Sequence, residues 1–124
     1  MKVLDKSMMS NLSFPDFCVE KMEFSLKKKN LKLFVEGAWL DIDGGEQLGR
    51  GILFFDGWSS LTIKRFNPIS ESWSHLPNTE FESLKDICEF KSIDSTFYIY
   101  GFGKQTGYWI EWKICNSKSH AEFA

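Results

Sequence analysis

The chain has few histidines, few cysteines and no long apolar run. Only His75 and His120 are present, which excludes a multi-histidine metal site and leaves any histidine-dependent catalysis to one of these two residues. No stretch approaches the roughly eighteen apolar residues that a membrane-spanning helix needs. Polar residues interrupt segment 1–17 before the apolar core of a signal peptide develops. These absences predict a soluble protein that has no signal peptide and no membrane partner.

The cysteine content indicates the cellular compartment, and the net charge indicates which classes of partner to expect. Cys18, Cys88 and Cys115 form an odd set without CxxC spacing, which is atypical of a small secreted domain and favours reduced thiols in the cytoplasm. The net charge of −2 gives no general attraction to nucleic acid. The lysine run 27–29 separates two apolar segments and is typical of a solvated hairpin connection.

Aromatic residues are what the chain has in excess. Twelve Phe, five Trp and three Tyr make up 16% of the 124 residues, and such side chains favour pleated, half-buried strands over helix interiors. The length suits one hydrophobic core. We therefore expect a single β domain over residues 19–124, preceded by an N-terminal arm, 1–18, that is loosely held or forms a short helix.

Period-two alternation predicts about eight or nine antiparallel strands. The two clearest hairpins join segments around residues 19–26 and 31–36, and strands 96–102 and 108–115. Residues 79–86, with acids early, are the best helical candidate. The fold class is thus mainly β: an antiparallel meander forming a barrel, half-barrel or sandwich, with one short helix near residues 79–86.

No motif predicts a catalytic residue, a metal site or a cofactor. The carboxylates of 41–46 lack the spacing of a calcium loop, and we interpret the segment as a polar turn. The glycine-rich segment 101–107 precedes a strand pattern rather than a helix, so it predicts a hairpin and not a phosphate site. Residues 57–61 lack the second glycine of a hydrolase elbow.

Both faces of the 96–115 hairpin carry aromatics. Alternation places Trp112 with Ile110 and Ile114 on the predicted core face, and Trp109 on the other face. Either both faces are buried, or the second face is exposed as a binding surface, because Trp and Tyr provide contact area at low entropic cost. The candidate site is a surface aromatic patch of five residues: Trp109, Tyr98, Tyr100, Glu111 and Lys113.

Segments 84–90 and 101–112 resemble parts of short uncharacterised bacterial proteins, some of which are similar to immunity proteins of toxin–immunity pairs. The resemblance covers about a third of the chain. It implies a cytoplasmic protein that binds and blocks a toxin through acidic and aromatic surface residues. It transfers no catalytic or metal residue.

Three functions therefore stay open. The first hypothesis is a non-enzymatic protein-binding module, possibly of the immunity type, whose partner is another protein or a second copy of the chain. The alternative is a carrier of a small apolar ligand, with a cavity lined by Phe24, Phe54 and Trp112. The third is an enzyme that uses His75.

Overall fold

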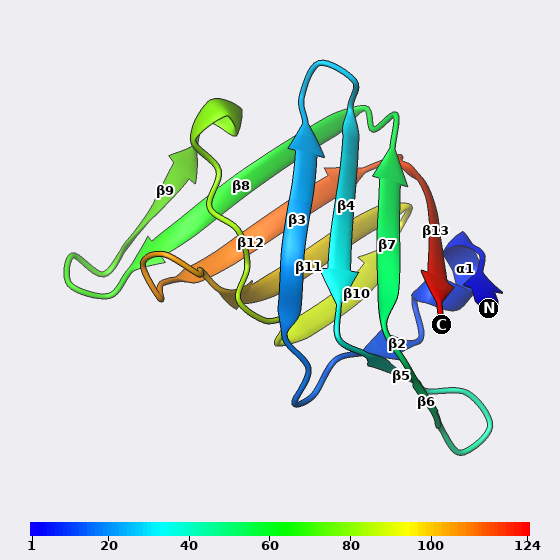
Figure 1. Cartoon of the computed structure of the whole chain (residues 1–124). Helices are drawn as coiled ribbons and strands as arrows, with labels where there is room; N and C mark the ends of the chain where they lie inside the picture. Colours follow the sequence, from blue (N-terminus) through cyan, green and yellow to red (C-terminus); the bar gives the residue numbers. More distant parts are fainter.

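The chain folds into three antiparallel sheets, two of which have five strands each and face one another (Figure 1). The computed structural model describes all 124 residues, with 58% in strands and 6% in helical turns. The mainly β class predicted from the aromatic content and the alternation is confirmed. The large sheets do not close into a barrel, so the fold is a sandwich or half-barrel.

The first large sheet has the strand order β1-β13-β7-β4-β3. It contains the predicted hairpin across the lysine run, and alternation buries Leu31, Leu33 and Val35 on its inner face. Its strands are β1 (Lys2–Leu4), β3 (Val19–Ser25), β4 (Asn30–Val35), β7 (Gly51–Asp56) and β13 (Lys118–Phe123).

The second large sheet has the order β10-β11-β12-β8-β9 and contains the other predicted hairpin, β11–β12. Ile110, Trp112 and Ile114 are fully buried on its inner face. Its strands are β8 (Ser60–Asn67), β9 (Ser72–Leu76), β10 (Glu89–Ile93), β11 (Thr96–Phe102) and β12 (Trp109–Cys115).

The remaining elements are short. The third sheet pairs β2 (Leu12–Ser13), β5 (Ala38–Leu40) and β6 (Glu46–Leu48), and the carboxylate-rich segment 41–46 forms its turn. Helix α1 (Lys6–Met9) is capped by the Asp5 side chain, which accepts a hydrogen bond from the Met8 N–H. Neither α1 nor the 3-10 turn η1 (Asn78–Glu80) has the length and apolarity to cross a membrane.

Residues 1–18 are packed into the fold. Strand β1 pairs with β13, and Leu4, Met9, Leu12 and Phe14 are buried in the core. The inner faces of the two large sheets share this core, where Phe55 meets Phe97 at 5.2 Å between ring centroids. The N-terminal segment is therefore part of the same hydrophobic core as the two sheets.

Two local expectations are corrected. Residues 79–86 do not form a helix: only η1 turns, and the chain then runs extended with Glu82, Leu84 and Ile87 buried. Glu82 and Leu84 are buried while Ser83 between them is not, which is the alternation of an extended segment. The predicted meander is not continuous either. The Asp56–Gly57 turn does not form a hairpin but connects β7 of the first large sheet to β8 of the second.

Candidate functional site

Four aromatic residues form a line across the outer face of the second large sheet. Phe102 on β11 lies opposite Trp109 on β12. Trp109 lies opposite Phe66 on β8, and Phe66 lies opposite Trp73 on the edge strand β9. Phe102 and Trp109 meet at 5.2 Å between centroids, and Phe66 and Trp73 at 5.4 Å. We call Phe102, Trp109, Phe66 and Trp73 the aromatic row.

The row is open to solvent. Trp73 is 49% exposed and Phe102 is 42% exposed, while Trp109 and Phe66 are half-buried. No lysine or arginine amine lies over any of these four rings. A line of uncovered rings spanning four strands is unusual on the solvent side of an antiparallel sheet, which is normally polar.

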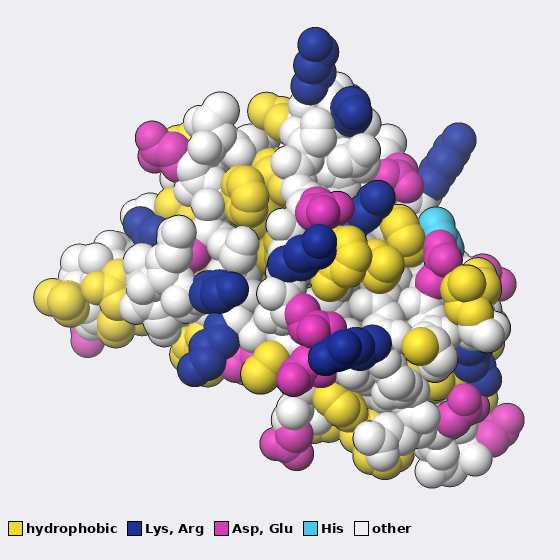
Figure 2. Space-filling model, in the orientation of Figure 1, with side chains coloured by type: hydrophobic (Ala, Val, Ile, Leu, Met, Phe, Trp, Pro, Cys, Tyr) yellow, Lys and Arg dark blue, Asp and Glu magenta, His cyan; other side chains and the backbone are white.

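The outer face of the first large sheet provides the contrast. It also carries aromatics, but the Lys21 amine lies 4.4 Å from the ring centroid of Phe34, and the His120 ring stacks on Phe54 at 4.4 Å. Figure 2 shows this side of the molecule, with Lys and Arg side chains lying among the hydrophobic ones. Cationic and aromatic groups of the chain therefore cover these rings, whereas the aromatic row has no such cover.

The five residues predicted as a surface patch all lie on the outer face beside or within the row. Tyr98 stacks on Tyr100 at 6.4 Å between centroids, and Tyr100 stacks on Trp109 at 6.1 Å. The Lys91 amine lies over both tyrosines, and the Lys113 amine over Tyr98. Of the predicted set, only Trp109 belongs to the uncovered row.

Tyr100 and Glu111 are coupled electrostatically. The two residues face one another across β11 and β12. Burial, and next the negative charge and hydrogen bond of Glu111, raise the pKa of Tyr100 to about 12. The Tyr100 hydroxyl therefore stays neutral at physiological pH, with its O–H directed to the Glu111 carboxylate.

Sequence reasoning missed Phe102, Phe66 and Trp73 as members of the site. Phe66 and Trp73 lie on β8 and β9, about forty residues before Trp109 in the chain, and nothing local links them to the β11–β12 hairpin. Alternation in β8 was the one available signal: with Leu61 and Ile63 inside, Phe66 falls on the outer face.

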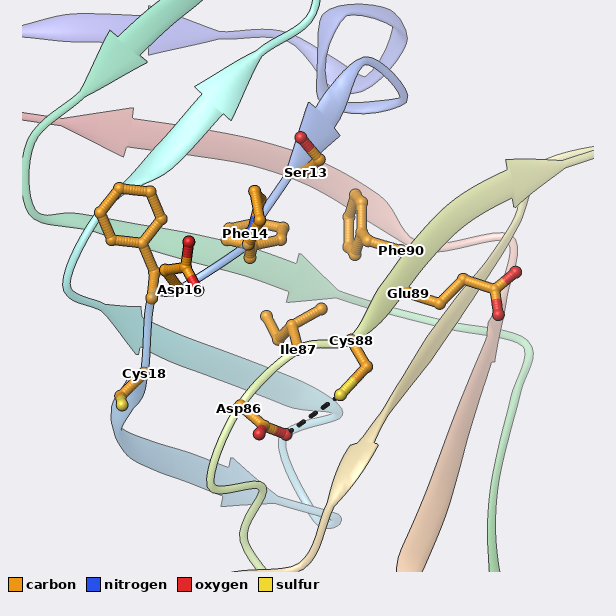
Figure 3. Close-up of a pocket in the computed structure, with 11 residues that line it drawn as sticks. Ser13, Phe14, Asp16, Cys18, Asp86, Ile87, Cys88, Glu89 and Phe90 are labelled. Carbon is orange, nitrogen blue, oxygen red and sulfur yellow. Dashed lines mark hydrogen bonds between the residues drawn. The ribbon is translucent and has the colours of Figure 1, made fainter.

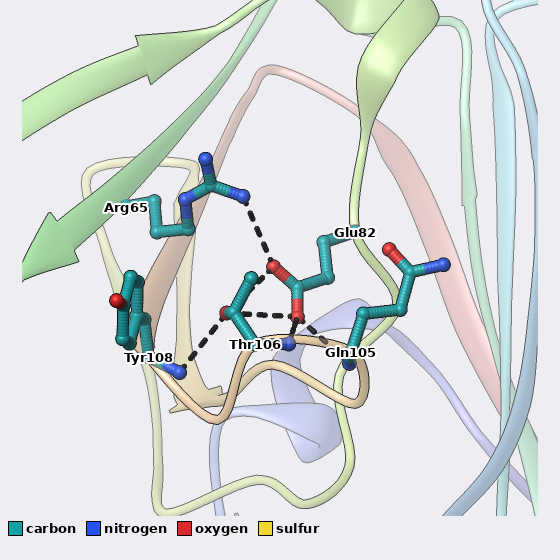
Figure 4. A network of polar contacts seen from close by, with 5 residues as sticks. All are labelled: Arg65, Glu82, Gln105, Thr106 and Tyr108. Carbon is teal, nitrogen blue, oxygen red and sulfur yellow. Dashed lines mark hydrogen bonds and ion pairs between the residues drawn. The ribbon is translucent and has the colours of Figure 1, made fainter.

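A buried carboxylate positions the loop between β11 and β12 (Figure 4). The Glu82 side chain is only 2% exposed, and it accepts hydrogen bonds from the Gln105 N–H at 2.8 Å and from the N–H and hydroxyl of Thr106. The Arg65 guanidinium completes the set at 3.2 Å. The loop that precedes Trp109 is thus held by one side chain from the extended segment that follows η1.

Close backbone packing fixes the same segment against β11. The Lys85 N–H donates to the Phe102 carbonyl, and the Cys88 N–H donates to the Tyr100 carbonyl. A Cβ atom at Gly101 would overlap the Asp86 carbonyl oxygen. The glycines of the 101–107 segment therefore serve hairpin packing, which agrees with the hairpin predicted there.

The largest surface groove lies elsewhere, between residues 13–18 and 86–90 (Figure 3). Its volume is about 630 Å³. Burial raises the pKa of the Cys88 thiol to about 11, and the hydrogen bond to Glu36 raises the pKa of Cys18. Both thiols are therefore protonated at neutral pH, which makes them poor nucleophiles and metal ligands.

The residues predicted for the ligand carrier and for the enzyme do not come together in a site. Phe24 and Trp112 pack against one another in the core at 5.4 Å between centroids, whereas Phe54 lies on the outer face against His120. The three residues therefore line no common cavity. His75 lies exposed on β9 opposite Lys64, and its side chain makes no hydrogen bond within the chain.

Comparison with protein-family models, curated proteins and solved structures found no match for the chain.

Proposed function

We propose that the chain is a non-enzymatic protein-binding module and that the aromatic row is the centre of its contact surface. The observation that carries the proposal is the continuity of the row, from Phe102 to Trp73 over four strands. Exposed aromatic clusters on small domains mark protein interfaces, and Trp is enriched among the residues that dominate binding energy.

The surroundings of the row support a protein partner. Around the uncovered rings lie Lys64, Glu111, Lys91 and Lys113 on the same face, which gives an apolar centre with a charged periphery. Protein interfaces have this organisation, because rim charges add specificity while the centre excludes water. An inhibitor of a toxin, as the resemblance of segments 84–90 and 101–112 implies, is the form of this function that we propose.

The test compares two variants in affinity capture from the native source. Trp109→Ala removes the middle of the row, and Phe34→Ala removes a half-buried ring from the outer face of the opposite sheet. We expect a partner that wild type and Phe34→Ala retain and that Trp109→Ala loses. With the purified partner, Trp109→Ala should weaken binding by about 2 kcal/mol or more.

Retention by all three proteins, or loss with both variants, would contradict the proposal. A partner that still binds Trp109→Ala uses another surface. A partner that both variants lose does not depend specifically on the aromatic row.

A further inference from the structure

Of the four edges of the two large sheets, three are protected and β9 is not. Strand β1 is only three residues long. Strand β3 has a register shift between Val19 and Lys21, and the Val19 N–H donates to the Lys85 carbonyl. Strand β10 carries the ion pair Glu89–Lys91 and lies against β2. Short length, bulges, charge and cover are the usual protections of a sheet edge against pairing with another chain.

Strand β9 has none of these protections. It pairs in regular register with β8 over all five residues, and its sequence, Ser-Trp-Ser-His-Leu, contains no lysine, arginine or carboxylate. Alternate residues of an edge strand direct their backbone N–H and C=O groups away from the sheet. No group of the chain hydrogen-bonds to that side of β9. The adjoining loop also exposes 84% of Ile69.

We propose that β9 pairs antiparallel with β9 of a second copy of the chain, with Ser74 on the two-fold axis. In this register Ser74 faces Ser74, Trp73 faces His75 of the second copy, and Ser72 faces Leu76. No like charges oppose one another, and an aromatic ring faces an imidazole on the outer side, which is a favourable cross-strand combination. The result is a closed two-fold dimer.

Self-complementarity selects a second copy over an unrelated strand. Discrimination between unrelated partners depends on complementary groups such as opposite charges. Strand β9 carries no charged side chain with which it could select one foreign strand over another. The identical strand, by contrast, is matched in length, and on the outer face it places the His75 imidazole opposite the Trp73 ring. Pairing would also place Trp73 of each copy beside the axis, so that the two aromatic rows meet in one ten-stranded sheet.

The dimer is expected to be weak and reversible. Five strand residues per copy are far fewer than the roughly 20–30 per side of a standard interface. The inference concerns β9 alone and does not depend on the proposed partner: loss of dimerisation and loss of partner binding are measured separately, and Trp109→Ala should leave the dimer intact.

The experiment is sedimentation velocity of the full chain over concentrations up to about 1 mM, with a pair of charge variants. Ser74→Lys and Ser74→Glu each place like charges at the two-fold axis, and the exposed Ser74 side chain makes no hydrogen bond, so both variants should fold. Each alone should dimerise at least about tenfold more weakly than wild type, because like charges face one another across the axis. An equimolar mixture should recover the dimer. Ile93→Lys, at an exposed position on the opposite edge strand β10, is the control and should dimerise like wild type.

A wild-type chain that stays monomeric over the whole concentration range would overturn the inference. So would a dimer that persists in both Ser74 variants, or a mixture that remains as weak as either variant alone.

Discussion

At the scale of single residues, two tryptophans three positions apart on one strand have opposite surroundings. Trp112 is fully buried, with the rings of Phe24 and Phe81 packed against it, whereas Trp109 lies half-buried on the outer face. We expect Trp112→Ala to lower the free energy of unfolding by about 3–5 kcal/mol, as large aromatic truncations in cores do. Trp109→Ala should cost about 1 kcal/mol or less. Urea denaturation measures both; equal large losses would mean that Trp109 is also a core residue.

Glu82 is the residue on which the loop before Trp109 depends. Its removal leaves the N–H groups of Gln105 and Thr106 and the Arg65 guanidinium without their acceptor. We expect Glu82→Ala to destabilise the fold by about 2–3 kcal/mol, because the donors that surround this buried carboxylate lose their acceptor. Amide hydrogen exchange of residues 103–107 should accelerate together with this loss. Glu80→Ala, at an exposed position of η1, is the control, and an equal effect from both would remove the special role of Glu82.

The thiols should titrate in an order opposite to their exposure. Cys88 is exposed, yet burial of its sulfur raises its pKa from 9.0 to about 11, while the hydrogen bond from Ser60 lowers the pKa of half-buried Cys115. We expect iodoacetamide to label Cys115 with a midpoint below pH 9 and Cys88 with a midpoint near pH 11, measured on variants that each retain one cysteine. Since folding raises the pKa of Cys88, its contribution to stability is full below pH 9 and is lost as pH rises toward 11. Identical profiles for the two thiols would contradict these pKa shifts.

At the scale of elements, the close approach of segment 84–88 to β11 can be tested at a glycine. A methyl group at Gly101 meets the backbone of Asp86, which cannot move without breaking the hydrogen bonds to Tyr100 and Phe102. We expect Gly101→Ala to destabilise the fold by about 1–3 kcal/mol, the usual cost of overpacking. Gly49→Ala meets only a carbonyl oxygen at 3.4 Å and should be tolerated. Thermal unfolding compares the two, and a neutral Gly101→Ala would show that the segment is loosely placed.

Elements built from neighbouring residues were predictable, and those built from distant ones were not. The hairpins β3–β4 and β11–β12 follow from alternation on either side of a polar turn, and the same alternation correctly separated Trp112 from Trp109. Segment 79–86 was predicted to be helical because early acids favour a helix start. Its conformation after η1 depends instead on the distant loop whose N–H groups Glu82 binds. Pairings such as β12 with β8 join segments far apart in the chain, and local pattern carries no information about them. Of the aromatic row, which depends on that pairing, only Trp109 was therefore predicted as a site residue.

At the scale of the whole molecule, the two large sheets present outer faces of different character. One face has its rings covered by Lys21, Lys32 and His120, and the other leaves the aromatic row uncovered beside an unprotected edge strand. Both faces rest on one shared core. The asymmetry of the molecule is thus a property of its surfaces, and it is the reason why we propose the second large sheet as the binding side.

Hydrogen exchange of the chain with and without its captured protein partner tests that assignment most directly. We expect the partner to slow amide exchange in residues 60–76 and 96–115, which contain β8, β9, β11 and β12, and to leave residues 19–56, which contain β3, β4 and β7 of the first large sheet, unchanged. Protection confined to residues 19–56, with β8 to β12 exchanging as in the free chain, would contradict the account.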